Sequence, residues 1–203
     1  MQVNPYPFMS EEWYRWTHEE SQAMHDVFLR WVEPRVAQIH SVAEIGCGIH
    51  RFYADWFCGR HIRYCGLDRD EMVCNQREKH MLPLESLHCI DWPVAEYGRI
   101  YPDLVFSRAT IDHVSDPDEF LRRAIGSARR YVYLMTYRPY DADLKAHVIE
   151  KGADGYYYND LSPSRIAAVI EEFQPQRYEV RCQPTGRAEP EIQTEIHIEI
   201  EVA

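Results

Sequence analysis

The sequence has neither closely spaced cysteines nor an excess of basic residues, and both absences exclude classes of function. Its 203 residues include 6 cysteines but no C-x-x-C pair, so we expect no zinc knuckle, no thioredoxin-type redox site and no other metal site. Lysine and arginine number 22 against 33 acidic residues, a net charge of -11. Surfaces that bind nucleic acid or anionic membranes are usually basic, so we expect neither as a partner.

Long apolar segments are also missing. Residues 1–16 are polar and aromatic and lack the charged and apolar regions of a secretory signal. No apolar run reaches the roughly 18 residues that a membrane span requires. Together with the cysteine usage, these features predict a protein of the reducing cytoplasm, which we expect to be a monomer or a homodimer.

What the sequence does contain is a regular alternation of short apolar runs with stretches of helical spacing. Apolar residues make up 45% of a chain long enough for one domain with a sizeable core. Alternation of this kind is typical of an α/β fold, a parallel sheet with helices on both faces. The expected strands are 42–45, 64–67, 86–90, 104–108 and 131–135, and the expected helices are 52–57, 72–81 and the segment that starts at Ser115.

The end of the chain departs from this alternation. Ser162 followed by Pro163 predicts a helix start, but the two strands expected next, 178–182 and 192–202, have no helix between them. They therefore predict an antiparallel hairpin that completes a doubly wound, mostly parallel, seven-stranded sheet. Along 192–202, apolar residues alternate with glutamate, glutamine and histidine, which predicts one buried and one solvated face.

The chain is expected to divide into an N-terminal helical segment and a larger domain. Ser10 can cap a helix, and Pro34 is expected to break or kink it. We assign residues 1–40 to this helical lid and 41–203 to the main domain, with an insertion at about 139–160.

Three groups of residues are expected to meet where the parallel strands end. Glycines in Gly46-Cys47-Gly48 allow a tight turn and the close approach of a ligand. Asp68 follows the second strand and can accept both hydroxyls of a ribose, while Asp91 and Trp92 follow the third and suit an adenine ring. Because ligands of doubly wound sheets bind at the carboxyl ends of the strands, the three groups predict a nucleotide-like cofactor.

In this pattern the sequence resembles the class I S-adenosyl-L-methionine (SAM)-dependent methyltransferase family. The first motif of that family, an acid two residues before G-x-G, is matched by Glu44, Gly46 and Gly48, and its next two acids are matched by Asp68 and Asp91. The resemblance covers about 36–203 and implies SAM as cofactor and S-adenosyl-L-homocysteine (SAH) as product. The cofactor residues it implies are Glu44, Gly46, Cys47, Gly48, Asp68, Arg69, Asp91, Trp92, Ser107 and Arg108.

One residue departs from the family pattern. A third glycine often follows the G-x-G, and His50 occupies that place here. A nicotinamide-binding G-x-G-x-x-G motif would require a glycine where Arg51 stands, so the dinucleotide alternative fits less well.

The methyl acceptor is expected over the loops that follow the fourth and fifth strands. His113 is the candidate general base, with Asp112 and Tyr137 as further catalytic candidates, although His113 could instead only orient its loop. Loops over a ligand face often carry specificity, but the tyrosines of the insertion could equally pack it onto the domain, and the N-terminal tryptophans could be a lid or an apolar helix face. The substrate candidates are Trp13, Trp16, Arg138, His147 and Tyr157.

Together these observations predict methyl transfer to oxygen or nitrogen of a small molecule. Three alternatives stay open: a SAM-binding protein that transfers no methyl group, a peptide methyltransferase and a nicotinamide-dependent oxidoreductase. The residues do not identify the acceptor, because fold does not imply function.

Overall fold

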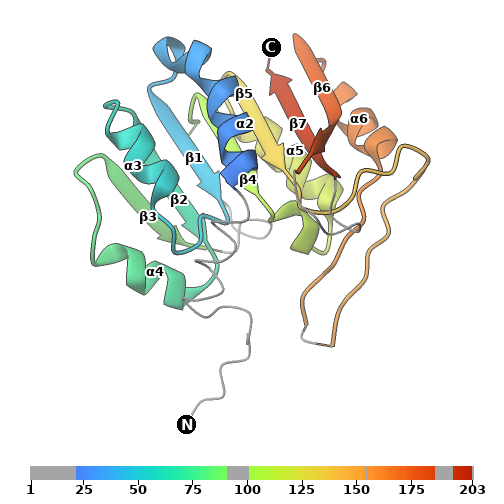
Figure 1. Ribbon diagram of the computed structural model, residues 1–203, viewed down its shortest axis with the longest axis horizontal. Coiled ribbons are helices and arrows are strands. Elements are labelled where there is room, and N and C mark those ends of the chain that lie inside the picture. The colour runs from blue at the N-terminus through green and yellow to red at the C-terminus, as the bar shows by residue number, and fades with distance from the viewer. Residues whose placement is uncertain (1–21, 91–100, 154, 186–193, 203) are drawn as a thin grey trace.

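The computed structural model describes residues 22–90, 101–153, 155–185 and 194–202. Its centre is a seven-stranded sheet in the order β3-β2-β1-β4-β5-β7-β6 (Figure 1). The first five strands run parallel, and β7 runs antiparallel to both β5 and β6. This confirms the predicted doubly wound sheet with its closing hairpin. The strands are β1 (Ser41–Ile45), β2 (Arg63–Asp68), β3 (Glu85–Cys89), β4 (Leu104–Arg108), β5 (Tyr131–Met135), β6 (Arg177–Pro184) and β7 (Thr194–Glu201).

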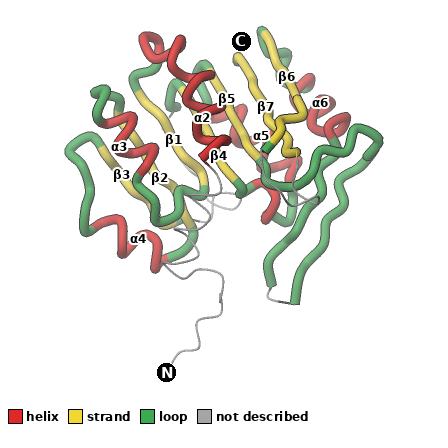
Figure 2. The backbone as a smooth tube through the Cα atoms, viewed as in Figure 1, coloured by secondary structure: helices red, strands yellow, loops and turns green. Residues whose placement is uncertain are grey.

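Helices cover both faces of this sheet (Figure 2). Buried side chains of α2 and α3 pack on one face, and those of α5 and α6 pack on the other. The two resulting cores differ, because the α2 side is rich in aromatic rings whereas the α5 side is mainly aliphatic. The helices are α2 (Gln22–Val32), α3 (Phe52–Cys58), α4 (Glu71–Glu78), α5 (Pro117–Ser127) and α6 (Pro163–Glu171), with short 3-10 turns η1 (Glu33–Gln38) and η2 (Ile111–His113).

The predicted helix start at Ser162 is confirmed, whereas the one at Ser115 is wrong by one residue. Ser162 Oγ accepts the backbone N–H of Arg165 at 3.2 Å. At the other helix, the Oδ1 atom of Asp116 accepts the N–H of Glu119 at 2.9 Å. Pro117 sets this boundary, because its fixed φ and missing N–H suit the first helical position and make the preceding residue the cap.

The predicted solvated face of the last strand is wrong for its first half, whereas Glu199 and Glu201 of its second half are partly exposed. β7 lies between β5 and β6 rather than at the edge of the sheet, and the side chains of Glu195 and His197 are 0% exposed. Burial lowers the pKa of His197 to about 3 and Arg181 acts in the same direction, so the ring is neutral. His197 Nδ1 contacts Tyr133 Oη at 2.5 Å, and Nε2 contacts Glu195 Oε1 at 2.6 Å. Both ring nitrogens of His197 therefore have polar partners inside the protein.

The segment predicted as an N-terminal lid belongs in part to the core. Phe28 and Val32 of α2 are fully buried against the sheet, and Pro34 lies where α2 gives way to η1. A lid could therefore be formed only by the residues before α2, which include Trp13 and Trp16 and lie outside the described residues.

Candidate functional site

The carboxyl ends of β1, β2, β4 and β5 lie side by side. This row of strand ends is called the sheet edge below. The order of the strands reverses between β1 and β4, so this is the topological switch point at which doubly wound folds bind ligands. The glycine loop, residues 46–50, leaves β1 at this edge. The loop after β4 and the long connection after β5 leave it beside the glycine loop.

Gly46 explains why the glycine loop needs a residue without a side chain at its start. Its φ of +71° lies in the left-handed region, and a Cβ atom there would lie 2.0 Å from Thr110 Oγ1. The N–H groups of Gly46 and Cys47 both donate to the carbonyl oxygen of Leu67, at 2.8 and 3.1 Å. The loop is thus held between β2 and the loop after β4.

Asp68 lies directly against the glycine loop. Its Oδ2 atom accepts the N–H of Gly48 at 2.9 Å, and its Oδ1 atom accepts the N–H of Asp70 at 3.0 Å. Burial raises the pKa of Asp68, while these backbone bonds lower it. A carboxylate has about four acceptor positions, so Asp68 retains capacity for the hydroxyl groups of a ligand.

Glu44, the first acid of the motif, is buried in β1 two residues before Gly46. The Tyr64 hydroxyl donates a short hydrogen bond to its Oε2 atom. Burial raises the pKa of Glu44 to about 7, although Arg77, Tyr64 and Arg108 all act to lower it. The carboxyl group therefore changes charge near neutral pH, and its charge responds to whatever binds beside it.

The other predicted cofactor residues take different positions. The Ser107 hydroxyl donates to the carbonyl oxygen of Ile45 at 2.8 Å, so it ties β4 to β1. The Cys47 side chain is buried, and burial raises its pKa, so the residue can present only backbone to a ligand. Arg108 is half-buried at the end of β4. Asp91 and Trp92 lie outside the described residues.

Asp112 joins the loops that follow β4 and β5. It is fully buried, and its Oδ2 atom accepts the N–H of Tyr137 at 3.2 Å. Its carbonyl oxygen accepts the N–H of Asn159 at 2.9 Å. Burial raises the pKa of Asp112 to about 7. These contacts position the loops after β4 and β5 against the insertion.

His113 is oriented by the insertion, and this contact fixes the tautomer that its neutral ring adopts. Its Nδ1 atom lies 2.6 Å from the carbonyl oxygen of Tyr157, and a carbonyl can only accept. Nδ1 must therefore carry the hydrogen, which leaves the Nε2 atom of the neutral ring with the lone pair of a base. The rings of Tyr137, Tyr158 and Tyr156 surround the imidazole, with centroids 5.4, 5.5 and 6.1 Å away.

The insertion is a two-stranded hairpin that reaches back across the sheet edge. Val148 and Asp160 exchange backbone hydrogen bonds of 2.9 and 3.0 Å, and Arg138 Nη2 closes the base with an ion pair to Asp160 at 2.6 Å. At the other end, Arg69 Cζ lies 5.2 Å from the ring centroid of Tyr156. Since Arg69 follows β2, this contact links the insertion to the cofactor side.

Besides Arg138, which pairs with Asp160, two of the predicted substrate residues have partners within the protein. His147 Nδ1 accepts the N–H of Ser162 at 2.9 Å, and Nε2 lies 3.1 Å from Asp118 Oδ1, so neither ring nitrogen is available to a substrate. Lys151 Nζ lies 5.6 Å from the ring centroid of Tyr157. The contribution of Tyr157 to the site is therefore its carbonyl oxygen as well as its ring.

Sequence reasoning missed three residues that shape this site. Asn159 is buried and donates from Nδ2 to the carbonyl oxygen of Val114 at 2.7 Å. Tyr53 Oη lies 2.5 Å from His25 Nδ1. Burial raises the pKa of Tyr53; Arg108 acts to lower it, whereas Glu44 and Glu195 act to raise it. The third residue is the buried Arg77. No motif marks these positions, because each acts through contacts between distant segments.

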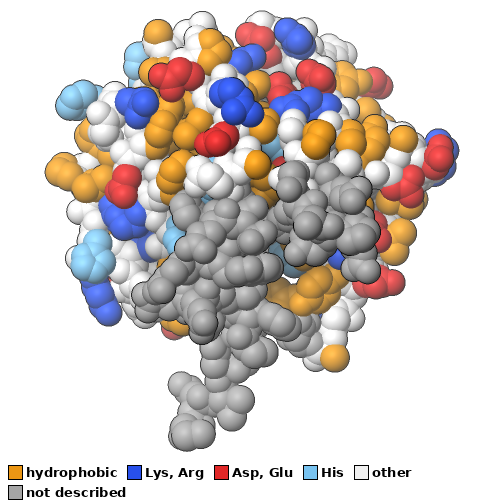
Figure 3. Space-filling view, in the orientation of Figure 1, with side chains coloured by type: hydrophobic (Ala, Val, Ile, Leu, Met, Phe, Trp, Pro, Cys, Tyr) orange, Lys and Arg blue, Asp and Glu red, His pale blue; other side chains and the backbone are white. Residues whose placement is uncertain are grey.

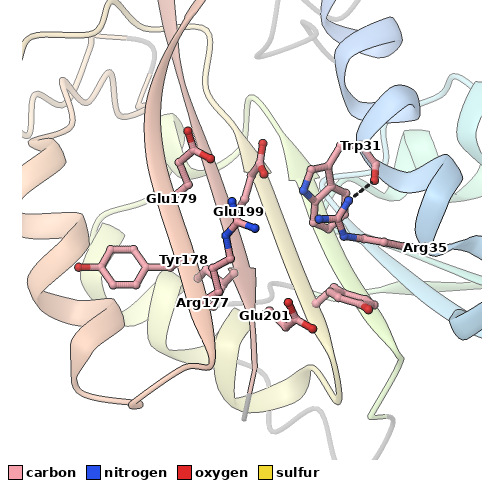
Figure 4. Close-up of a pocket in the computed structure, with 9 residues that line it drawn as sticks. Trp31, Arg35, Arg177, Tyr178, Glu179, Glu199 and Glu201 are labelled. Atoms are coloured by element: carbon pink, nitrogen blue, oxygen red, sulfur yellow. Dashed lines mark hydrogen bonds between the residues drawn. The ribbon is translucent and has the colours of Figure 1, made fainter.

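A hollow lies at the opposite end of the parallel strands, where β5 begins and β7 ends (Figure 4). Arg35 Cζ lies 4.2 Å from the ring centroid of Trp31, and its Nη1 atom donates to the Trp31 carbonyl oxygen at 2.6 Å. Glutamates of β6 and β7 line the other side. This hollow is separate from the glycine loop and contributes nothing to the candidate site.

Within the described residues, no group of three potential ligands is placed to hold a metal ion, and no helix is long and apolar enough to cross a membrane. On the face that carries α2, acidic and basic side chains are interspersed over the part that the structure describes (Figure 3).

Solved structures share this architecture over nearly the whole chain. Magnesium protoporphyrin IX methyltransferase from Synechocystis PCC 6803, with bound SAM, superposes with a TM-score of 0.68 at 12% identity, covering 98% of this chain and 94% of that one. The fold is that of the class I SAM-dependent methyltransferases. An N1-methyltransferase of 1,6-didemethyltoxoflavin from Burkholderia thailandensis, with SAH bound, gives 0.62 at 12% identity and covers 92% and 85%.

The N-terminal domain of EvdMO1, with SAH bound, gives a TM-score of 0.66 at 17% identity and covers 86% of this chain and 79% of that one. The sequence itself matches no family model and no curated protein. At these identities the likeness establishes the methyltransferase fold alone.

Proposed function

We propose that this protein is a SAM-dependent methyltransferase that acts on oxygen or nitrogen of a small molecule. The observation that carries the proposal is the contact between Gly48 N–H and Asp68 at the switch point of a methyltransferase fold. The three solved structures were obtained with SAM or SAH bound, which supports SAM as the cofactor here.

The residues at the sheet edge fit this cofactor. Gly46 provides a turn that packs directly against the Thr110 side chain, which fixes the glycine loop beside the loop after β4. The Asp68 carboxylate can accept the hydroxyl groups of a ribose. Glu44 supplies a second carboxyl group behind the loop, and its negative form would favour the cationic sulfur of SAM. The chemistry that SAM supplies when bound is an activated methyl group.

On the acceptor side, the proposed base is His113. Its Nε2 lone pair can take the proton that a hydroxyl or N–H acceptor loses, while the Tyr157 carbonyl holds the Nδ1 hydrogen and fixes the ring. Asp112 positions the backbone that carries His113 and Tyr137. The tyrosine rings around the imidazole would favour a flat, largely apolar acceptor, since such a surface stacks on aromatic side chains.

Cellular setting and assembly are part of the same proposal. All 6 cysteines are free, which suits a reducing cytoplasm. The overall charge of -11 disfavours a nucleic-acid acceptor, and we propose a monomer or homodimer in which each chain binds its own cofactor.

Calorimetric titration of the purified protein with SAM, SAH and NAD tests the cofactor. We expect SAM and SAH to bind and NAD not to bind. Binding of NAD alone would replace the proposal with an oxidoreductase. If SAM binds, incubation with methyl-labelled SAM and a pool of small phenols, amines and N-heterocycles tests transfer. SAM binding with no labelled product and no dependence on His113 would indicate a binding protein instead.

A further inference from the structure

We propose that Arg77 is a positioning residue that holds the glycine loop in its cofactor-binding conformation and thereby replaces the third glycine that this chain lacks. The inference rests on the proposed function, because it concerns the same cofactor site. Arg77 belongs to α4, far from the loop in sequence, and its side chain is 1% exposed.

A single guanidinium nitrogen binds three carbonyl groups of the loop. Arg77 Nη1 lies 3.2 Å from the carbonyl oxygen of Cys47, 3.2 Å from that of Gly48 and 2.8 Å from that of His50. These residues span the G-x-G turn and the place of the missing glycine. The carbonyl groups of the loop after β1 therefore converge on the positively charged guanidinium group of Arg77.

This arrangement sets the direction of the N–H groups of the loop. In a trans peptide the carbonyl of one residue and the N–H of the next point in opposite directions. Carbonyls that face Arg77 thus turn the N–H groups of Gly48, Ile49 and Arg51 away from α4. Gly48 N–H does point that way, since it reaches Asp68 at 2.9 Å. Donors aimed outward along a turn form a concave site for an anionic or polar ligand group.

Glu85 of β3 anchors the guanidinium from the other side. Its Oε1 atom pairs with Arg77 Nη2 at 2.9 Å, while Oε2 pairs with Arg51 Nη2 at 2.8 Å and accepts the N–H of Leu82 at 3.0 Å. One buried carboxylate thus connects Arg77 with Arg51, the residue that follows the glycine loop and precedes α3.

A gain in folding stability alone does not explain why a buried arginine and glutamate pair stands at this position. Replacing a buried ion pair with well-packed apolar residues is often neutral or stabilising. An apolar side chain in place of Arg77, however, could not satisfy three loop carbonyls in a buried site. Lysine could balance the charge of Glu85, but its single ammonium lacks the planar fork that reaches the carbonyls and the carboxylate together.

Arg77 also contacts the first acid of the motif indirectly. Its Nη2 atom lies 3.4 Å from Tyr64 Oη, and Tyr64 donates to Glu44. The same guanidinium therefore fixes the loop backbone and, through one tyrosine, the orientation of the Glu44 carboxyl group.

The test compares Arg77→Lys with the wild type in thermal unfolding, in SAH titration and in methyl transfer. We expect a cooperative unfolding transition, SAH binding weakened by about 10-fold or more and a KM for SAM raised in parallel. The kcat should change little, because Arg77 does not touch the acceptor side. Arg122→Lys is the matched control, since Arg122 forms a two-bond ion pair with Glu172 of 2.8 and 2.9 Å on the surface.

A second experiment uses Arg77→Ala with added guanidinium ion at millimolar concentration. Recovery of SAH affinity with guanidinium, but not with ammonium, would support a positioning role, because a planar donor refills the site. Should neither Arg77 variant fold, Glu85→Gln removes the anchoring charge and leaves the carbonyl contacts in place. We expect it to weaken SAH binding by about threefold or more.

Wild-type protein that binds SAH, together with a folded Arg77→Lys or Glu85→Gln variant of unchanged affinity, would overturn the inference. Wild-type protein that fails to bind SAH would instead overturn the proposed function. The two failures are therefore distinguishable.

Discussion

The two halves of the candidate site are built in different ways. The cofactor half consists of backbone groups and buried charges contributed by β1, β2, α4 and β3, which follow one another along the chain. The acceptor half consists of side chains on loops, and its key contacts join residues 25 and 44 positions apart, Asp112 with Tyr137 and His113 with Tyr157. The first half is held mainly by backbone groups, and the second by contacts between distant loops.

This difference matters for function. A backbone loop tied at its carbonyls and its N–H groups has little freedom, so the cofactor half is organised before any ligand arrives. The acceptor half depends on a hairpin insertion that is fixed at its base by Arg138 and Asp160. We therefore expect substitutions in the cofactor half to act on binding and those in the acceptor half to act on turnover.

The largest effect is expected at Gly46. Gly46→Ala places a Cβ atom 2.0 Å from Thr110 Oγ1 at a φ of +71°, so we expect a loss of about 2–5 kcal/mol in the free energy of unfolding together with loss of SAH binding. Denaturant unfolding and SAH titration measure the two effects. Gly126→Ala is the control, because no atom lies within 4 Å of its Cβ position, and the change should stabilise α5 by up to about 1 kcal/mol. Equal stability and equal SAH binding of the two variants would show that the contact between Gly46 and Thr110 does not exclude a side chain.

Asp68→Ala should abolish measurable cofactor binding without unfolding the protein. Removal of the carboxylate deletes the expected ribose contacts and releases Gly48 N–H, and we expect SAH affinity to fall by at least about 100-fold. Asp68→Asn keeps an acceptor oxygen and should lose less. An Asp68→Ala variant that binds SAH like the wild type would place the cofactor elsewhere.

His113→Ala should separate the two halves most cleanly. If Nε2 is the base, kcat falls by about 100-fold while SAH affinity stays at its wild-type value. The kcat is measured as turnover under saturating SAM, and the SAH affinity is measured by calorimetric titration. His40→Ala is the control, since this exposed histidine precedes β1 at the opposite edge of the sheet. Unchanged kcat in His113→Ala would leave the histidine with a purely structural role.

The smallest effect is expected from the charge of Glu44. Its pKa of about 7 predicts that SAM affinity rises as pH increases through 7, within about 10-fold, because the carboxylate form attracts the sulfonium. SAH, which has no positive sulfur, should respond less. Because the pKa is above 4.5 in the folded protein, the free energy of unfolding should fall between pH 4.5 and about 7.

Glu44→Gln should flatten both pH profiles, since the amide does not ionise. A variant that keeps the pH dependence of SAM binding would show that another group titrates in this range. Asp112, whose pKa is also raised to about 7, is the group to replace next.

Much of the fold was predictable because its signals are local. Alternating apolar runs identified the strands, and the pairing of Ser162 with Pro163 identified a helix start that the structure confirms. The interior position of β7 was not predictable, because strand order depends on how distant segments pack. The buried Glu195 and His197 face is the consequence, since polar residues look solvated in sequence until their partners are known.

Of the candidate site, the sequence by itself determined the positive-φ glycine turn after β1 and the position of Asp68 after β2, because both are encoded within short stretches. Only the tertiary structure decided the rest. It brought Arg77 to the carbonyls of the glycine loop and Tyr157 to His113. The reason is physical: a turn follows from the conformational limits of neighbouring residues, whereas the partner of a buried charge or an imidazole is decided by which distant elements pack against it.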